Sequence, residues 1–143
     1  MKEIESFAKL SQTEQIYELT EVAKLAAVEF GIKVKDIANV SHSFNSTFYI
    51  TDDKTNKYSL RVNLNFSRDK SAITAEHKWL AEINKWKKIN VPQPIKTLNG
   101  QTYAHVYSKK LEFFLDCTLA HWIEGEEIGD DPTNSQLFEL GRI

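Results

Sequence analysis

The stretch that decides the fold reads Tyr58-Ser59-Leu60-Arg61-Val62-Asn63-Leu64. Apolar and polar side chains alternate along it, which predicts a β-strand because successive side chains of a strand point to opposite faces. The apolar members fall on one face, and Ser59, Arg61 and Asn63 fall on the other. Arg61 is therefore expected to point away from the more apolar side of a sheet.

The next element is a predicted helix over about residues 70–88, with an inward stripe at Ala72, Ile73, Trp79, Leu80, Ile83 and Trp86. Glu76 lies in or beside this stripe. A carboxylate that faces a core loses several kcal/mol of hydration unless a cation pairs with it. Arg61 is the nearest candidate in topology, so we predict an Arg61–Glu76 pair between strand and helix.

Further helices are predicted on both sides of this strand and helix. Ser11 and Glu14 have capping-box spacing before an amphipathic stretch that ends at Gly31, and residues 4–10 form a short helix or arm before it. Toward the other end, Asp131-Pro132 has the composition of an N-cap followed by the first residue of a helix.

The remaining strands are predicted from β-branched and aromatic runs bounded by polar turns, over about 34–41, 46–51, 93–98, 101–108 and 111–123. Asn99-Gly100 is a strong hairpin signal, so the strands on either side of it are expected to pair with each other. Together these elements predict one α+β domain.

Composition narrows the class of protein. The 143 residues carry 18 Lys and Arg against 20 Asp and Glu, a formal net charge of −2, with 41% hydrophobic residues. This balance does not favour nucleic acid as a partner, and no apolar run approaches the ~18 residues of a membrane helix. The lone Cys117 excludes an intramolecular disulfide and fits a reducing compartment, so the expected location is the cytoplasm. The four histidines lack metal-ligand spacing, and no metal site is predicted.

In their order and spacing, several segments resemble the aminoglycoside phosphotransferase family, which also contains choline-, homoserine- and fructosamine-type kinases. The matching segments are 44–50, 59–62, 75–80, 90–95 followed by 99–100, and 121–125. The resemblance implies a protein-kinase-like N-lobe: a five-stranded antiparallel sheet, one packed glutamate-bearing helix and an N-terminal helical extension. The implied divisions are an extension over 1–31, a nucleotide-binding lobe over 32–123, and a hinge exit with the start of a C-lobe helix over 124–143.

The resemblance also implies roles for residues that match the family's motifs. Arg61 would contact the α- and β-phosphates of ATP, Glu76 would orient Arg61, and Ser59 would lie beside the adenine. Many family members have Lys where this chain has Arg61, which keeps the charge but changes the geometry.

Two further parts of an ATP site follow from the same resemblance. The loop containing Asn45, Ser46 and Thr47 would bind phosphate through backbone N–H groups and hydroxyls, although a plain hairpin turn also explains its composition. Either Phe48 or Ile50 would cap the adenine. In the hinge, adenine would be held by the carbonyl of His121 and the N–H of Ile123; the other three histidines are interpreted as structural or surface residues.

Catalytic residues are not expected within these 143 residues. The family supplies them, with the ligands for Mg²⁺, from an H-x-D-x-x-x-x-N segment and a later Asp, and no histidine here is followed two places later by Asp. The prediction is the N-lobe of a phosphotransferase that moves the γ-phosphate of ATP to a hydroxyl of a small-molecule acceptor. The chain alone is expected to be inactive.

Several alternatives remain open at this stage. The acidic segment with Glu124, Glu126, Glu127, Asp130 and Asp131 fits either a helix N-terminus or a negative rim that attracts a cationic acceptor. A non-catalytic interaction domain that retains the lobe architecture is the rival function. In the simplest reading, the Arg61–Glu76 pair only holds the fold together. The sequence assigns neither the acceptor nor an oligomeric state.

Overall fold

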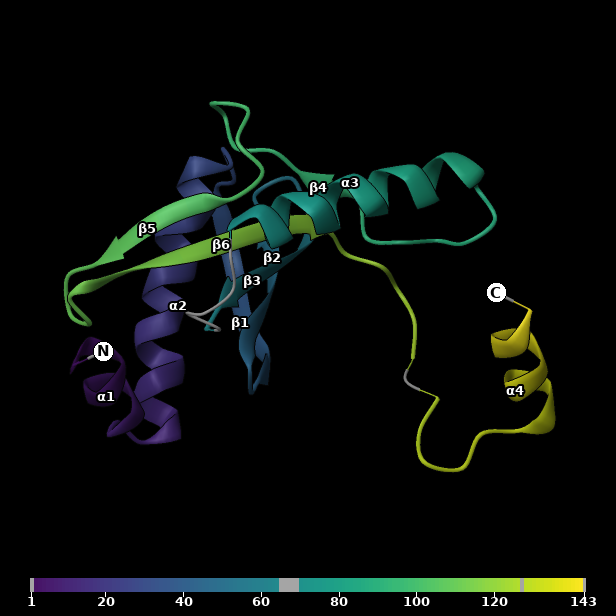
Figure 1. Cartoon of the computed structure of the whole chain (residues 1–143), viewed down its shortest axis with the longest axis horizontal. Coiled ribbons are helices and arrows are strands. Elements are labelled where there is room, and N and C mark those ends of the chain that lie inside the picture. The colour runs from purple at the N-terminus through teal and green to yellow at the C-terminus, as the bar shows by residue number, and fades with distance from the viewer. Residues whose placement is uncertain (1, 65–69, 127, 143) are drawn as a thin grey trace.

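In the computed structural model, which describes residues 2–64, 70–126 and 128–142, one antiparallel sheet lies between helices (Figure 1). The elements in chain order are α1 (Lys2–Ala8), α2 (Gln12–Glu29), β1 (Val34–His42), β2 (Asn45–Asp52), β3 (Lys57–Asn63), α3 (Lys70–Trp86), β4 (Pro94–Ile95), β5 (Ala104–Ser108), β6 (Phe113–His121) and α4 (Asn134–Gly141). The predicted α+β class is correct.

The sheet has the order β1-β2-β3-β6-β4, and β5 also pairs with β6. It therefore has six strands, where the family resemblance implied five; the strand predicted over 93–98 is present only as the two-residue β4. The tight turn before Gly100 forms, since the Gly100 N–H donates to the Thr97 carbonyl at 2.8 Å. The predicted hairpin around it is wrong, because β4 and β5 pair one after the other with the long β6. Pro92 and Pro94 have no N–H donors, which limits ladder formation along this stretch.

Helix α2 covers one face of the sheet and supplies much of the core. Leu19, Ala23 and Ala26 are fully buried and belong to one cluster with Phe48 and Leu60. The small alanines allow the helix backbone to lie close to the strands. The helix that the sequence placed in an N-terminal extension is thus one of the two layers of the core.

Both ends of α2 are fixed as the sequence predicted. Ser11 is the N-cap, and the Ser11–Glu14 capping box is complete. After the helix Gly31 has φ 73°, and a Cβ at this position would lie 2.8 Å from Leu98 Cδ2. The left-handed backbone conformation favours glycine at position 31, and a larger residue would also displace the exposed Leu98 side chain.

Helix α3 lies along the opposite face of the sheet, and its orientation differs from the predicted one. Its buried residues are Ile73, His77 and Ile83, whereas Trp79 and Trp86 are 65% and 67% exposed. The inward face is centred on the side that carries Glu76 and His77. The tryptophans, two turns apart, lie to one side of this face, so their predicted inward position is wrong.

Helix α4 begins later than predicted and buries none of its side chains. Its N-cap is Thr133 rather than Asp131, because Thr133 and Gln136 form a complete capping box. The helix stands apart from the sheet at the end of an extended segment (Figure 1). Within the described ranges, no helix combines the length and the apolar character that a membrane crossing demands.

The turn between β2 and β3 gives a prediction about acid stability. The Asp52 carboxylate accepts bonds from the N–H groups of Lys54 and Asn56, the Asn56 amide and the Tyr58 hydroxyl, at 2.8–3.1 Å. These bonds, led by that of the Asn56 side chain, lower the pKa of Asp52 below its ordinary value of 3.8. Because the folded pKa is depressed, the stabilisation is complete above pH 3.8 and is lost as the pH falls through the folded value.

We expect Asp52→Asn to lower the free energy of unfolding at neutral pH. In acid, the free energy of unfolding of this variant should fall less than that of the unchanged chain. Urea unfolding at neutral and acidic pH measures both effects. Asp53→Asn is the matched control, since the side-chain interaction of Asp53 among the described residues is an exposed ion pair with Lys33 at 3.4 Å. Equal behaviour of the two variants would contradict the role of Asp52.

Candidate functional site

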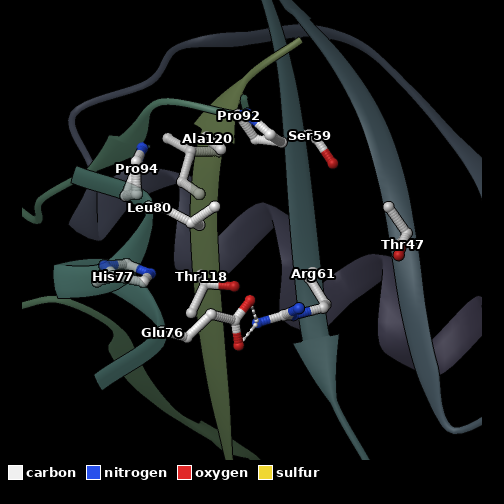
Figure 2. A pocket seen from close by; sticks show the side chains of 11 residues that line it. Thr47, Ser59, Arg61, Glu76, His77, Leu80, Pro92, Pro94, Thr118 and Ala120 are labelled. Atoms are coloured by element: carbon white, nitrogen blue, oxygen red, sulfur yellow. Dashed lines mark hydrogen bonds and ion pairs between the residues drawn. The ribbon is translucent and has the colours of Figure 1, made fainter. Parts of the chain in front are cut away.

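A cavity of about 290 Å³ lies between α3 and the face of the sheet opposite α2 (Figure 2). It is lined by side chains from β2, β3, α3, β6 and the segment around β4: Thr47, Ser59, Arg61, Glu76, His77, Leu80, Pro92, Pro94, Thr118, Leu119 and Ala120. The cavity brings together Thr47, Ser59, Arg61 and Glu76, which are four of the eight predicted ATP-binding residues.

Strand register explains why these side chains meet. Arg61 lies directly opposite Thr47 on β2 and Thr118 on β6. Side chains that face each other across an antiparallel pair share one face of the sheet. Ser59 lies in the next row, opposite Ala120 on β6. The polar side of β3 therefore forms the cavity floor, while its apolar side packs against α2.

The central feature of the cavity is the predicted ion pair between Arg61 and Glu76, which is present. Arg61 Nη2 donates to both carboxylate oxygens of Glu76, at 2.9 and 3.0 Å. The two side chains are 26% and 24% exposed. Figure 2 shows Glu76 reaching from α3 to the end of the Arg61 side chain above β3. The carboxylate thus holds the guanidinium at a fixed position in the cavity.

The guanidinium retains donors beyond those that Glu76 occupies. An arginine has five N–H groups, and the two hydrogen bonds to Glu76 described above both come from the single nitrogen Nη2. Arg61 Nε is buried and has no hydrogen-bond partner among the described residues. A buried donor without a partner costs free energy, so an anionic acceptor at this position would be stabilised.

The β1–β2 turn contributes fewer side chains to the cavity than the family resemblance implied. The Ser46 hydroxyl is fully buried on the α2 side and accepts a bond from Asn39 Nδ2 at 2.9 Å. Asn45 Oδ1 accepts from the Leu64 N–H at 3.4 Å. Of the three loop residues, Thr47 alone lines the cavity.

The predicted cap on adenine is wrong for both candidates. Phe48 and Ile50 are fully buried in the core and lie on the α2 face of β2. The intervening Tyr49 lies opposite Ser59 and therefore on the cavity face. Its ring packs edge-on against Trp122, with centroids 4.8 Å apart. Sequence reasoning missed both aromatic rings, because the alternation along residues 45–52 places an aromatic residue on each face and does not show which face lines the cavity.

The two predicted hinge residues, His121 and Ile123, lie at and just beyond the end of β6. The His121 ring lies near Tyr58 on the α2 face, with centroids 5.7 Å apart. The N–H of His121 donates to the Gln93 carbonyl at 3.0 Å, and that of Trp122 donates to the Lys57 carbonyl at 3.1 Å. No acceptor for the Ile123 N–H is found among the described residues. Just beyond, Glu124 forms an ion pair with Lys57.

His77 is a cavity residue that the sequence interpretation treated as structural or surface. It is 9% exposed and follows Glu76 on α3. Its position four residues after Ile73 was the available signal, since such residues share a helix face. Burial lowers the pKa of His77 below its ordinary 6.5; the negative charge of Glu76 opposes this shift, and the positive charge of Arg61 adds to it.

The acidic residues around the hinge exit do not assemble into a metal site. Across residues 2–64, 70–126 and 128–142, no group of three or more His, Cys, Asp or Glu side chains is placed to hold an ion. Glu127, one of the predicted acidic rim, lies outside the described residues. Glu124, Glu126, Asp130 and Asp131 are exposed.

The sheet, the glutamate-bearing helix and the strand cation together define a kinase-like N-lobe. Comparison with solved structures agrees: the chain is similar to a microcompartment-associated aminopropanol kinase, with a TM-score of 0.66 and 18% identity over 76% of this chain and 33% of that one. It is also similar to an amicoumacin kinase in complex with AMP-PNP, Ca²⁺ and Ami, with a TM-score of 0.66 and 16% identity over 84% of this chain and 36% of that one.

These likenesses show a shared fold. The chain spans about a third of the length of either kinase. No protein-family model matches the chain, and no curated protein matches it. The resemblance to aminoglycoside phosphotransferase-like kinases is therefore confirmed at the level of the fold.

The environment of His77 gives a second prediction about pH. Because the pKa of His77 is lowered in the folded chain, its ring binds a proton just below pH 6.5 in the unfolded chain but stays neutral in the folded chain. The free energy of unfolding should fall as the pH decreases from 6.5 toward the folded pKa. His77→Gln should remove this part of the pH dependence.

The measurement is an NMR titration of the imidazole signals, together with chemical unfolding of both chains across this pH range. A His77 ring that titrates at or above 6.5 would contradict the described environment. So would a pH dependence of stability that is identical in His77→Gln and the unchanged chain.

Proposed function

We propose that this chain is the nucleotide-binding lobe of an ATP-dependent phosphotransferase that acts on a hydroxyl group of a small molecule. The observation that carries the proposal is the Arg61 guanidinium, held by Glu76 in a cavity and left with unused donors. Phosphate oxygens are the acceptors that this fork-shaped cation binds best. A cytoplasmic location, where ATP is available, belongs to the same proposal.

In this proposal Arg61 binds the α- and β-phosphates while Glu76 fixes its orientation. The hydroxyls of Thr47 and Thr118 flank Arg61 on the neighbouring strands and supply further donors. Arg61 does not act as an acid or base. Its contribution is to position the phosphates and to reduce their charge repulsion.

The adenine would lie beside Ser59 and Ala120, the cross-strand pair next to Arg61 and Thr118 on the cavity face of the sheet. The carbonyl of His121 and the N–H of Ile123 would bind its polar edge, and Tyr49 with Trp122 would cover it at the hinge end. Side-chain identity at His121 is unimportant here, because its ring faces the other side of the sheet. The β1–β2 turn would contribute backbone N–H groups of Asn45 and Ser46 rather than the Ser46 hydroxyl.

Magnesium and the acceptor would be bound by residues outside those described. The described residues do not form a group of ligands that fits a metal ion, so no step is assigned to one. One structural neighbour was solved with AMP-PNP and Ca²⁺, which supports nucleotide and divalent-metal use in this fold. The acidic residues beyond Ile123 make a cationic acceptor the preferred class. Without the metal ligands and a catalytic base, the chain alone should bind nucleotide weakly and should not turn it over.

We expect Mg²⁺-ATP at millimolar concentration to shift the backbone amide signals of Ser59, Arg61, Thr118 and Ile123 in the 143-residue chain. Arg61→Ala should weaken this binding at least about tenfold, because a charge-assisted phosphate contact is lost. Arg61→Lys should retain part of the affinity, since it keeps the charge without the fork. An NMR titration measures all three.

The matched control is Lys33→Ala, which removes the same charge from an exposed ion pair with Asp53. If the unchanged chain shows no shifts, the nucleotide proposal for this chain is overturned. If Arg61→Ala lowers only stability and leaves ATP binding intact, the ion pair serves the fold alone, and the rival interaction-domain function gains support.

A further inference from the structure

A second cavity, of about 370 Å³, lies between α3 and the segment that carries β4 and the following turn. It is lined by Thr74, His77, Lys78, Ala81, Asn84, Gln93, Pro94, Lys96 and Thr102. His77 and Pro94 also line the first cavity, so these two residues separate the two spaces. None of the nucleotide-binding residues discussed above contributes to the second cavity.

The lining of the second cavity is positively charged. Lys78 comes from α3 and Lys96 from the segment after β4, and the described residues that line the space include no carboxylate. Neither lysine forms a salt bridge with another described residue. Four other lysines, Lys24, Lys33, Lys57 and Lys85, form ion pairs with described carboxylates. Two lysines that line one cavity favour an anionic ligand, because an anion between them would relieve their mutual repulsion.

Neutral donors complete the lining. Thr74 and Thr102 both line the cavity, and their hydroxyl oxygens lie 3.5 Å from each other. Asn84 Nδ2 donates to Gln93 Oε1 at 2.8 Å, which fixes the Gln93 amide and leaves its N–H groups available. Hydroxyl and amide groups beside lysines suit an oxyanion with several acceptor oxygens.

We infer that this cavity is a binding site for a small phosphate-bearing molecule, held by Lys78 and Lys96 and oriented by Thr102 and the Gln93 amide. The space is large for a lone phosphate group, so the ligand would be a phosphorylated metabolite of modest size rather than inorganic phosphate itself. The site is separate from the Arg61 cavity and does not depend on the proposed nucleotide function.

A consequence for α3 does rest on the proposed function. The ligand would bridge α3 and the β4 segment, and Lys78 lies two residues after Glu76 on that helix. Binding would therefore favour one position of α3, and with it the contact between Glu76 and Arg61. By linkage, a nucleotide bound through Arg61 would strengthen binding in the second cavity by the same factor.

The test uses inorganic phosphate as the probe in an NMR titration of the 143-residue chain, with sodium chloride of matched ionic strength as the reference. Phosphate is expected to shift the amide signals of Lys78, Lys96 and Thr102. The double variant Lys78→Gln/Lys96→Gln should weaken this binding at least about tenfold, because both charge-assisted contacts are lost. Lys85→Gln, which removes an α3 charge facing Glu82, should leave it unchanged.

Arg61→Gln separates this site from the nucleotide cavity. If phosphate still shifts the three amide signals in Arg61→Gln, the second site is supported independently of the nucleotide proposal. Three results would overturn it: shifts that match those in sodium chloride, shifts confined to residues around Arg61, or equal weakening in Lys85→Gln and the double variant. Amide spectra of the variants establish that each is folded.

Discussion

The ion pair between Arg61 and Glu76 is the interaction on which the arrangement of the site depends. Helix α3 buries only three of its side chains, so apolar packing holds it far less firmly than it holds α2. The two side chains of the pair are about one quarter exposed. Their desolvation therefore costs less free energy than that of a fully buried ion pair, and solvent screens their attraction less than that of a surface pair. The Arg61–Glu76 pair joins α3 to the centre of the sheet. By the same contact it fixes Arg61, the one arginine or lysine among the described residues that line the first cavity.

Strand alternation is the constraint that makes this pair possible, and it is the part of the fold that could be predicted from sequence. Along β3 the two faces differ clearly in polarity, so the direction of Arg61 and its pairing with Glu76 were predictable. The capping box at Ser11 and the turn at Gly31 were predictable because each depends on residues close together in the chain.

Features that depend on contacts between distant segments could not be predicted. Both faces of β2 contain an aromatic residue, so only its register with β3 shows that Tyr49, and not Phe48, shares a face with Ser59. On α3, two tryptophans extended the predicted apolar stripe in the wrong direction, and both rings are about two-thirds exposed in the structure. The pairing of β4 and β5 with a single long β6 is likewise set by the partner strand and not by the turn between them.

The central claim is that Arg61, held by Glu76, binds the phosphates of a nucleotide in the cavity between α3 and β3. A crystal structure of the 143-residue chain with Mg²⁺ and AMP-PNP tests it most directly. The account predicts phosphate oxygens within hydrogen-bond distance of the Arg61 guanidinium, with Glu76 still paired to it and the adenine beside Ser59 and the hinge backbone. A nucleotide bound elsewhere, or one seated in this cavity with Arg61 making no contact to phosphate, would contradict it.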